Sequence, residues 1–170
     1  MSEKISTPNE SSKQDVKGSL LVVNLRGLVN TRTPVRTTLE QLKIGRRFNA
    51  TIVPDDRVHQ GMLNISKEHV AWCKLDASTA EKLLRTRSEK STGTRTPESE
   101  LIGKDFTSVA EIAKGLESGK LRLNALPKIR PFFRLSPPRG GFKRSTRRQF
   151  GDGGILGRNN ELPSLVEKML

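Results

Sequence analysis

The chain has 170 residues, of which 33% are apolar, and its 31 Lys and Arg against 18 Asp and Glu give a net charge of +13. The low apolar share excludes a core that uses the whole chain, and the positive charge favours a polyanionic partner, with nucleic acid ahead of an acidic membrane surface. Short apolar runs and a single cysteine, Cys73, exclude a membrane span, an internal disulfide and a cysteine-based zinc site, so we expect a soluble, cytoplasmic protein.

Residues 1–18 are polar, with acids balancing lysines, and predict a flexible tail because they offer too little burial to offset ordering entropy. Residues 19–76 form a compact block that predicts the order βαβαβ. Its three expected strands are Leu20–Leu25, Phe48–Val53 and Val70–Leu75, each apolar or alternating. The first strand, rich in valine, is predicted to be buried.

Two helices are expected between these strands. Thr33 before Pro34 predicts an N-cap with proline at the first helical position, and Gly45 is expected to end that helix. Asp55 or Asp56 is expected to cap the second helix. Each helix has apolar residues on one face, which must pack on the sheet.

These segments resemble a known family. The runs RGLVNTRTPVRTTLEQLKI, RRFNATIVPDDRVHQGMLN and HVAW, with PPRGGFK and GDGGILGRNN in the tail, are similar to the archaeal and eukaryotic form of the large-subunit ribosomal protein thirty family, whose eukaryotic relative is large-subunit protein seven. One departure is Trp72-Cys73-Lys74, where the family usually has a glycine after the aromatic residue; it affects only the local backbone.

The resemblance implies an α+β fold with a three-stranded antiparallel sheet backed by two helices, related to the ferredoxin-like arrangement. It also implies contacts with large-subunit rRNA near the 5S rRNA, and with neighbouring ribosomal proteins. In this family the first loop and the start of the first helix lie against rRNA.

Residues 77–127 predict a helical insertion with an exposed linker at 87–100, which has no apolar residue. Asp76 or Ser78 is expected to cap the first helix of the insertion. Ser108 and Glu111 form the capping box of another, and Leu121–Leu126 is expected to be strand-like.

Residues 128–170 predict a basic extension that ends in a helix after Asn160. The part from Lys128 to Arg158, here called the basic tract, has nine basic residues and one acid, a net charge of +8. Its prolines and glycines predict an extended, irregular chain that RNA would order, with the glycines of GDGGILGRNN allowing close approach of backbone to RNA.

RNA contacts are expected from two regions. In the 19–76 block the basic side chains lie at strand ends, in the loop and at helix boundaries, so they can converge on one edge; the alternative is an exposed helix face or simple C-terminal capping. The candidates there are Arg26, Gly27, Arg32, Arg36, Arg46 and Arg47. In the tract they are Arg130, Arg134, Arg139, Gly140, Gly141, Lys143, Arg144, Arg147, Arg148 and Arg158.

Four phenylalanines of the tract could stack on unpaired bases or anchor the tract to the core. Both interpretations stay open for Phe132, Phe133, Phe142 and Phe150.

No catalytic, metal or cofactor site is predicted. His59 and His69 lie ten residues apart without a ligand pattern and are expected at the surface, and GGFKRS lacks the glycine that a nucleotide-binding loop has directly before its lysine. The leading hypothesis is a structural constituent of the large ribosomal subunit that binds rRNA, without a small-molecule substrate or membrane partner. The alternatives are a free-standing RNA-binding or RNA-processing factor and, more remotely, an enzyme.

Overall fold

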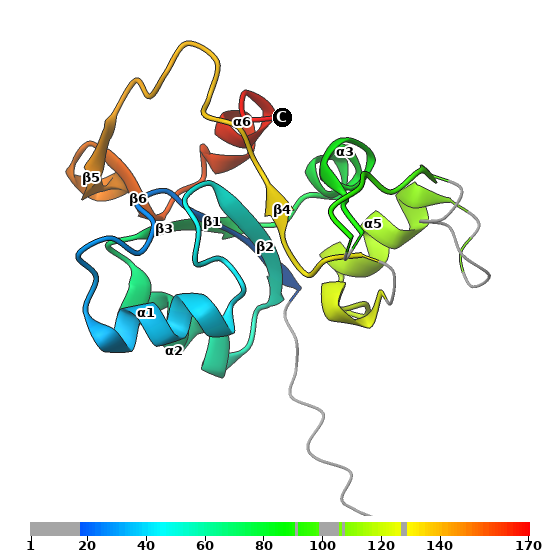
Figure 1. The fold of residues 1–170 in the computed structure, drawn as a ribbon, viewed down its shortest axis with the longest axis horizontal. Helices are drawn as coiled ribbons and strands as arrows, with labels where there is room; N and C mark the ends of the chain where they lie inside the picture. The colour runs from blue at the N-terminus through cyan, green and yellow to red at the C-terminus, as the bar shows by residue number, and fades with distance from the viewer. Residues whose placement is uncertain (1–17, 91, 99–105, 107, 127–128) are drawn as a thin grey trace, which may run out of the picture.

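The protein is an α+β fold built on one mixed sheet with helices on both faces (Figure 1). The computed structural model describes residues 18–90, 92–98, 106, 108–126 and 129–170. The predicted tail, except Gly18, lies outside the described residues, as does Lys128 of the basic tract. No helix of the described part has the length and apolar character needed to cross a membrane.

The sheet has six strands in the order β4-β2-β1-β3-β6-β5. Strands β4, β2, β1 and β3 are antiparallel, whereas β6 pairs in parallel with both β3 and β5. Their bounds are Ser19–Asn24 for β1, Asn49–Pro54 for β2, Val70–Lys74 for β3, Phe133–Arg134 for β4, Ser145–Gln149 for β5 and Gly154–Arg158 for β6.

The predicted three-stranded sheet is therefore only the middle of a larger one. The order β2-β1-β3 is present, but strands from the second half of the chain extend both of its edges. The tract was expected to be irregular, and this is wrong for β5 and β6. Gly154 explains part of the difference, because a Cβ at this position would collide with the carbonyl of Arg148, so the glycine allows close approach of protein backbone and not of RNA.

Helices cover the two faces unequally. Helices α1, Thr33–Gln41, and α2, Arg57–Ser66, lie together on one face. The other face packs against α3, Ala77–Arg87, α5, Val109–Glu117, and the C-terminal α6, Leu162–Glu167.

Strand β1 is buried on both sides, as its valine-rich sequence predicts. Leu20 and Val22 join the apolar cluster under α1 and α2, whereas Leu21 and Val23 join the larger cluster on the opposite face. Because successive side chains of a strand point to opposite faces, a strand with helices on both sides is apolar throughout.

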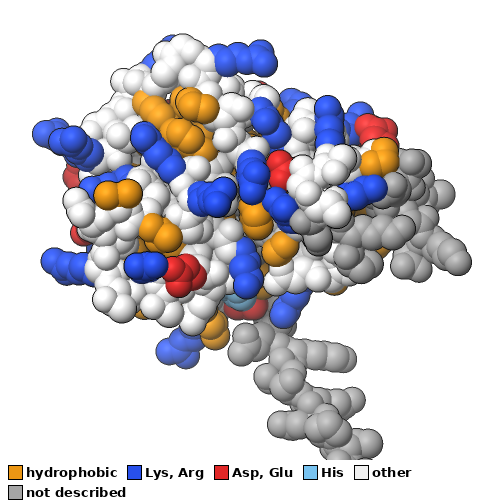
Figure 2. Space-filling model, viewed as in Figure 1, with side chains coloured by type: hydrophobic (Ala, Val, Ile, Leu, Met, Phe, Trp, Pro, Cys, Tyr) orange, Lys and Arg blue, Asp and Glu red, His pale blue; other side chains and the backbone are white. Residues whose placement is uncertain are grey.

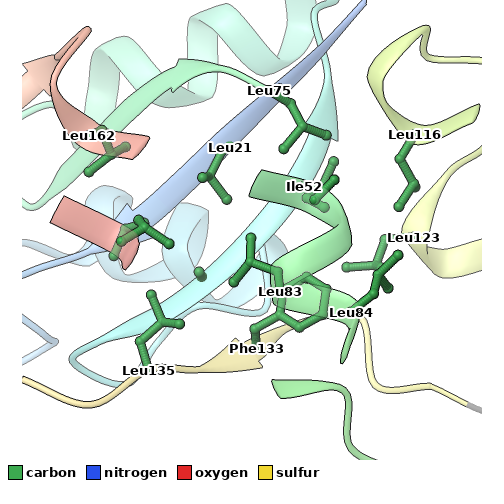
Figure 3. Packing of buried hydrophobic residues seen from close by; sticks show 14 of the residues in the cluster. Leu21, Ile52, Leu75, Leu83, Leu84, Leu116, Leu123, Phe133, Leu135 and Leu162 are labelled. Carbon is green, nitrogen blue, oxygen red and sulfur yellow. The ribbon is translucent and has the colours of Figure 1, made fainter. Parts of the chain in front are cut away.

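The larger cluster joins distant parts of the chain (Figure 3). Phe133 of β4 is completely buried among side chains that include Leu83 and Leu84 of α3. Leu162, Val166 and Met169 bring the C-terminal segment into the same cluster. The anchoring role of Phe133 follows from this burial.

Of the predicted helix boundaries, some need correction and one is confirmed. Arg32, and not Thr33, occupies the N-cap of α1, so Thr33 is already helical, and the helix ends at Gln41 before Lys43 turns with φ of +62°. Ser108 does cap α5 by accepting a hydrogen bond from the Glu111 backbone N–H at 3.3 Å. Asp56 is the N-cap residue of α2 without a side-chain capping bond.

Two further segments differ from expectation. The expected strand at Leu121–Leu126 is a 3-10 turn at Leu123–Ala125. In the predicted exposed linker, Ser88 and Thr96 are buried, and an isolated antiparallel β-bridge between the backbones of Glu89 and Arg95 closes the loop. The domain boundaries drawn from the sequence stay a prediction. Strands β4 and β6 lie beyond these boundaries and pair with β2 and β3 of the 19–76 block.

Candidate nucleic-acid interface

The basic tract meets the 19–76 block in an open hollow beside β4. The hollow has a volume of about 570 Å³ and is lined by Arg46 and Lys43 from the turn after α1 and by Arg130, Phe132 and Arg134 from the tract. Glu40 is the acidic residue of the lining, which also includes Leu28, Gly45 and Asn49. Four cationic side chains from two distant parts of the sequence therefore border one surface.

Glu89 positions two of these cations. The Arg130 guanidinium lies 3.3 Å from the Glu89 carboxylate and the Arg134 guanidinium 3.9 Å from it. Arg130 also lies over the ring of Phe132, 5.8 Å from its centroid. One carboxylate between two guanidinium groups leaves excess positive charge at the hollow.

A second junction joins the Gly140-Gly141 turn to the 19–76 block. The rings of Phe48 and Phe142 stack with centroids 6.1 Å apart. The guanidinium of Arg47 lies 4.7 Å from the Phe48 centroid, and its Nε donates a hydrogen bond to the carbonyl of Leu25 at 2.9 Å. Phe142 is thus a protein anchor in this structure, while Gly140, Gly141 and Lys143 beside it are exposed.

Strand β5 forms an arginine-bearing edge of the sheet. Arg147 and Arg148 lie on it and are exposed. Arg144, just before the strand, pairs with Glu161 at 3.0 Å and lies over Phe150 at 5.0 Å from the ring centroid. Charged side chains on an edge strand discourage pairing with another strand and leave the cations open to an anion.

The other candidates of the 19–76 block do not gather in one place. Arg26 donates a hydrogen bond to the carbonyl of Glu68 at 3.3 Å, and Arg36 pairs with Glu40 at 3.0 Å on the exposed side of α1. Arg32 is exposed at the N-cap of α1, while Gly27 is buried with φ of +81° and next to Arg47.

Arg139 and Arg158 are the remaining candidates of the tract. Arg139 is exposed, and its backbone N–H donates to the carbonyl of Lys168. Arg158 lines a separate hollow together with Trp72.

Sequence reasoning missed Lys43, Phe48, Trp72 and Glu89. The signal for Phe48 was present, because it directly follows Arg46-Arg47 and repeats the mixture of basic and aromatic residues seen in the tract. No local signal identifies Glu89, whose role depends on contacts about forty residues along the chain.

The face seen in Figure 2 carries many more Lys and Arg side chains than Asp and Glu, with apolar side chains between them. No group of three or more His, Cys, Asp or Glu that could hold a metal occurs in the part of the chain that the structure describes. Burial raises the pKa of the Cys73 thiol to about 12, and nearby Asp76 adds to the rise. This thiol is therefore protonated at neutral pH and is a poor nucleophile.

His69 is largely buried and not at the surface as expected; its Nε2 lies 3.1 Å from the Thr31 hydroxyl. Burial lowers the pKa of His69, Arg26 lowers it further, and Glu68 partly opposes the change. The pKa of His59 is also lowered, mainly by burial.

These shifts predict a pH-dependent stability. A lowered pKa in the folded state means that the unfolded chain binds more protons near pH 6, so stability is lost as the pH falls from the ordinary pKa of about 6.5 toward the folded values. We expect the melting temperature to decrease from about pH 7 to about pH 5.5 and the decrease to be smaller in His69→Gln. Melting curves over this range test it; an equal pH dependence in the variant would contradict the assignment to His69.

Together the sheet and its charged borders define a basic α+β protein with cationic side chains exposed along the sheet edges. No protein-family model matches the chain. It is 40% identical to large ribosomal subunit protein uL30 of Korarchaeum cryptofilum, over 89% of this chain and 94% of the relative. It is 37% identical to the protein of the same name from Cenarchaeum symbiosum, over 90% and 99%, and 35% identical to that of Staphylothermus marinus, over 88% and 96%. The chain belongs to the uL30 family in its archaeal form.

Proposed function

We propose that this chain binds and stabilises large-subunit rRNA through the hollow beside β4, the turn at Gly140-Gly141 and the basic edge strand β5. Its family makes it a structural constituent of the large ribosomal subunit, located in the cytoplasm as part of the ribosome, and not an enzyme. Its partners there are rRNA and other ribosomal proteins.

The observation that carries the proposal is the meeting of two basic segments at one hollow. Arg46 comes from the 19–76 block and Arg130 and Arg134 from the tract, and all three line it together with Phe132. Guanidinium groups bind phosphate oxygens in bidentate fashion, and each neutralised phosphate releases condensed counterions. An aromatic ring among them can contact an unpaired base or the sugar face.

The remaining candidate contacts extend the same surface. Arg147 and Arg148 on the sheet edge suit phosphates of a second RNA segment, since both are exposed and neighbouring side chains of an extended strand point to opposite faces, which directs the two cations to different phosphates. The proposal also includes proximity to the 5S rRNA and minor contacts from Arg26, Arg32 and Arg36.

A free-standing RNA-processing factor is the competing interpretation, and sedimentation separates the two. A constituent with many simultaneous contacts is expected to remain in the large-subunit fraction after a high-salt wash, at one copy per subunit. A factor with few contacts would appear in the wash. Ultraviolet crosslinking of the washed subunit, with crosslinked peptides identified, should then yield peptides that contain Phe132 or Arg134; their absence from all RNA-linked peptides would contradict the proposed interface.

A further inference from the structure

We propose that the hollow between α2, β3 and β6 holds one unpaired RNA nucleotide, with its base stacked on Trp72 and its phosphate at Arg158. This inference rests on the proposed function, because the nucleotide belongs to an RNA strand that the basic surface binds. It assigns a role to Trp72 and Asn64, neither of which belongs to the predicted contacts.

The hollow exists because the helices on this face stop short of the sheet edge. The apolar cluster under α1 and α2 takes residues from β1, β2 and β3 and none from β6. Strand β6 lies beyond β3 in the sheet, with Arg158 in register with Trp72. A space of about 390 Å³ remains between the two strands and α2, which lies within the range of about 300–1,000 Å³ typical of ligand sites.

The lining has the chemistry that a nucleotide requires. The ring of Trp72 is half-buried and packs against the cluster, so one part is fixed by the core while it also lines the hollow. Arg158 and Lys74 provide exposed cations for a phosphate. Asn64 on α2 provides an amide that can both donate to and accept from a base edge, the pattern that pairs with adenine.

Asp55 is the acidic residue that lines the hollow, and its Oδ1 accepts a hydrogen bond from the Gln60 amide at 2.7 Å. Among the lining residues two cations therefore face one carboxylate, which leaves the hollow positive. An aromatic face beside excess positive charge is the combination that single-stranded nucleic acid uses.

The same chemistry could bind a free mononucleotide, but the setting favours RNA. A nucleotide within a bound strand is presented to the hollow at high effective concentration, because the rest of the strand is held by the other basic contacts. A free nucleotide has only this hollow. We therefore expect adenosine monophosphate to bind at least about 100-fold more weakly than a strand that contains adenosine.

Trp72 reports directly on its own stacking. It is the one tryptophan of the chain, and the chain has no tyrosine. The tryptophan fluorescence of the protein therefore comes from this hollow. The probe is single-stranded oligoadenylate of about twelve nucleotides, within the site sizes of single-strand binders. Binding of an end-labelled copy is followed in parallel by fluorescence anisotropy.

The full-length protein is titrated with this strand, with its duplex with oligouridylate and with adenosine monophosphate. We expect the strand to quench Trp72 with the same midpoint as the anisotropy change, and the duplex, whose bases are already stacked, to quench little. Arg158→Gln should weaken the quenching midpoint about three- to tenfold. Arg57→Gln is the matched control: Arg57 is also exposed and begins α2, but it does not line the hollow, so the midpoint should stay unchanged.

The titrations distinguish failure of the nucleotide site from failure of the proposed function. Binding by anisotropy without quenching would overturn the nucleotide site and leave the proposed function intact. Equal midpoints for the monophosphate and the strand would identify a free-nucleotide site and overturn the RNA assignment. A strand that gives no anisotropy change, with large-subunit rRNA also unbound, would count against the proposed function itself.

Discussion

Phe133→Ala is expected to lower the free energy of unfolding by about 3–5 kcal/mol, the usual loss when a buried phenylalanine is truncated in a core. Phe133 is completely buried, and its ring lies where β4, α3 and the 3-10 turn meet (Figure 3). Truncation removes apolar contacts from several elements at once and leaves a cavity that a sheet with helices on both faces cannot easily close. Urea denaturation followed by circular dichroism measures the loss.

The neighbouring Phe132→Ala is the matched control. Phe132 is half-buried, lies beside the Arg130 guanidinium and lines the hollow beside β4. Its truncation should lower stability by less than about 1.5 kcal/mol, because the side chain keeps part of its surface in water. It should instead weaken binding to large-subunit rRNA. Equal stability losses in the two variants would show that both rings are core residues and would remove Phe132 from the interface.

This pair of phenylalanines shows what the sequence alone could decide. Two aromatic residues in a row, inside a basic tract, fit either stacking on RNA or anchoring to protein. The structure resolves the question, because Phe133 is completely buried in the core, whereas Phe132, which precedes the strand, is half-buried and lines the hollow beside β4. The strand is only Phe133–Arg134, too short to produce a periodic pattern, so its presence could not be inferred from sequence.

The central strands and helices were predictable for the opposite reason. Strands β1, β2 and β3 each have five or six residues with clear apolar patterns, and α1 and α2 follow turn or capping residues. What joins them to the tract is non-local. The Thr51 hydroxyl, for example, donates to the carbonyl of Pro131, 80 residues away, at 2.9 Å. No local sequence pattern indicates that Arg130 and Arg46 border the same hollow, so the hollow could not be predicted from the sequence.

The glycines of the tail illustrate the same limit. A glycine-rich run indicates close approach of the backbone to something, but it does not say to what. Gly154 makes room for the Arg148 carbonyl of β5, and so this part of the tract is in the sheet. The arginines on β5 then have a fixed spacing and an exposed position. That order makes their contribution to binding easier to isolate by mutation.

Replacing Arg139, Lys143, Arg144, Arg147 and Arg148 together by glutamine should weaken rRNA binding without unfolding the protein. All five side chains are exposed, and the ion pair between Arg144 and Glu161 is itself exposed and worth little to stability. If each neutralises one phosphate, the slope of log K against log salt should shrink by about 0.7–0.9 per residue, or about 4 in total. Near 0.1 M salt the affinity should then fall by on the order of 10⁴-fold.

A control with equal charge separates local contacts from the general attraction of a basic protein. Five exposed basic residues outside the proposed interface are replaced by glutamine in the control: Arg57, Lys67, Lys82, Lys114 and Lys120. Both variants carry +8 in place of +13, and each loses one exposed ion pair, since Lys82 pairs with Glu167. Filter binding of in vitro transcribed large-subunit rRNA across a salt series gives both slopes, and melting curves confirm folding.

The difference between the salt slopes of the two variants shows whether the phosphate contacts lie in the basic tract. Long-range attraction to RNA depends mainly on net charge and is screened within a Debye length of about 10 Å at 0.1 M salt, so it changes equally in both. Direct phosphate contacts change only where the side chains touch RNA. A slope that flattens by about 4 in the tract variant and by less than about 1 in the control places the phosphate contacts on the β5 edge and the adjoining turn. Equal flattening would mean that net charge alone governs binding, and an unchanged slope in both would move the contacts to Arg46, Arg47 and the hollow beside β4.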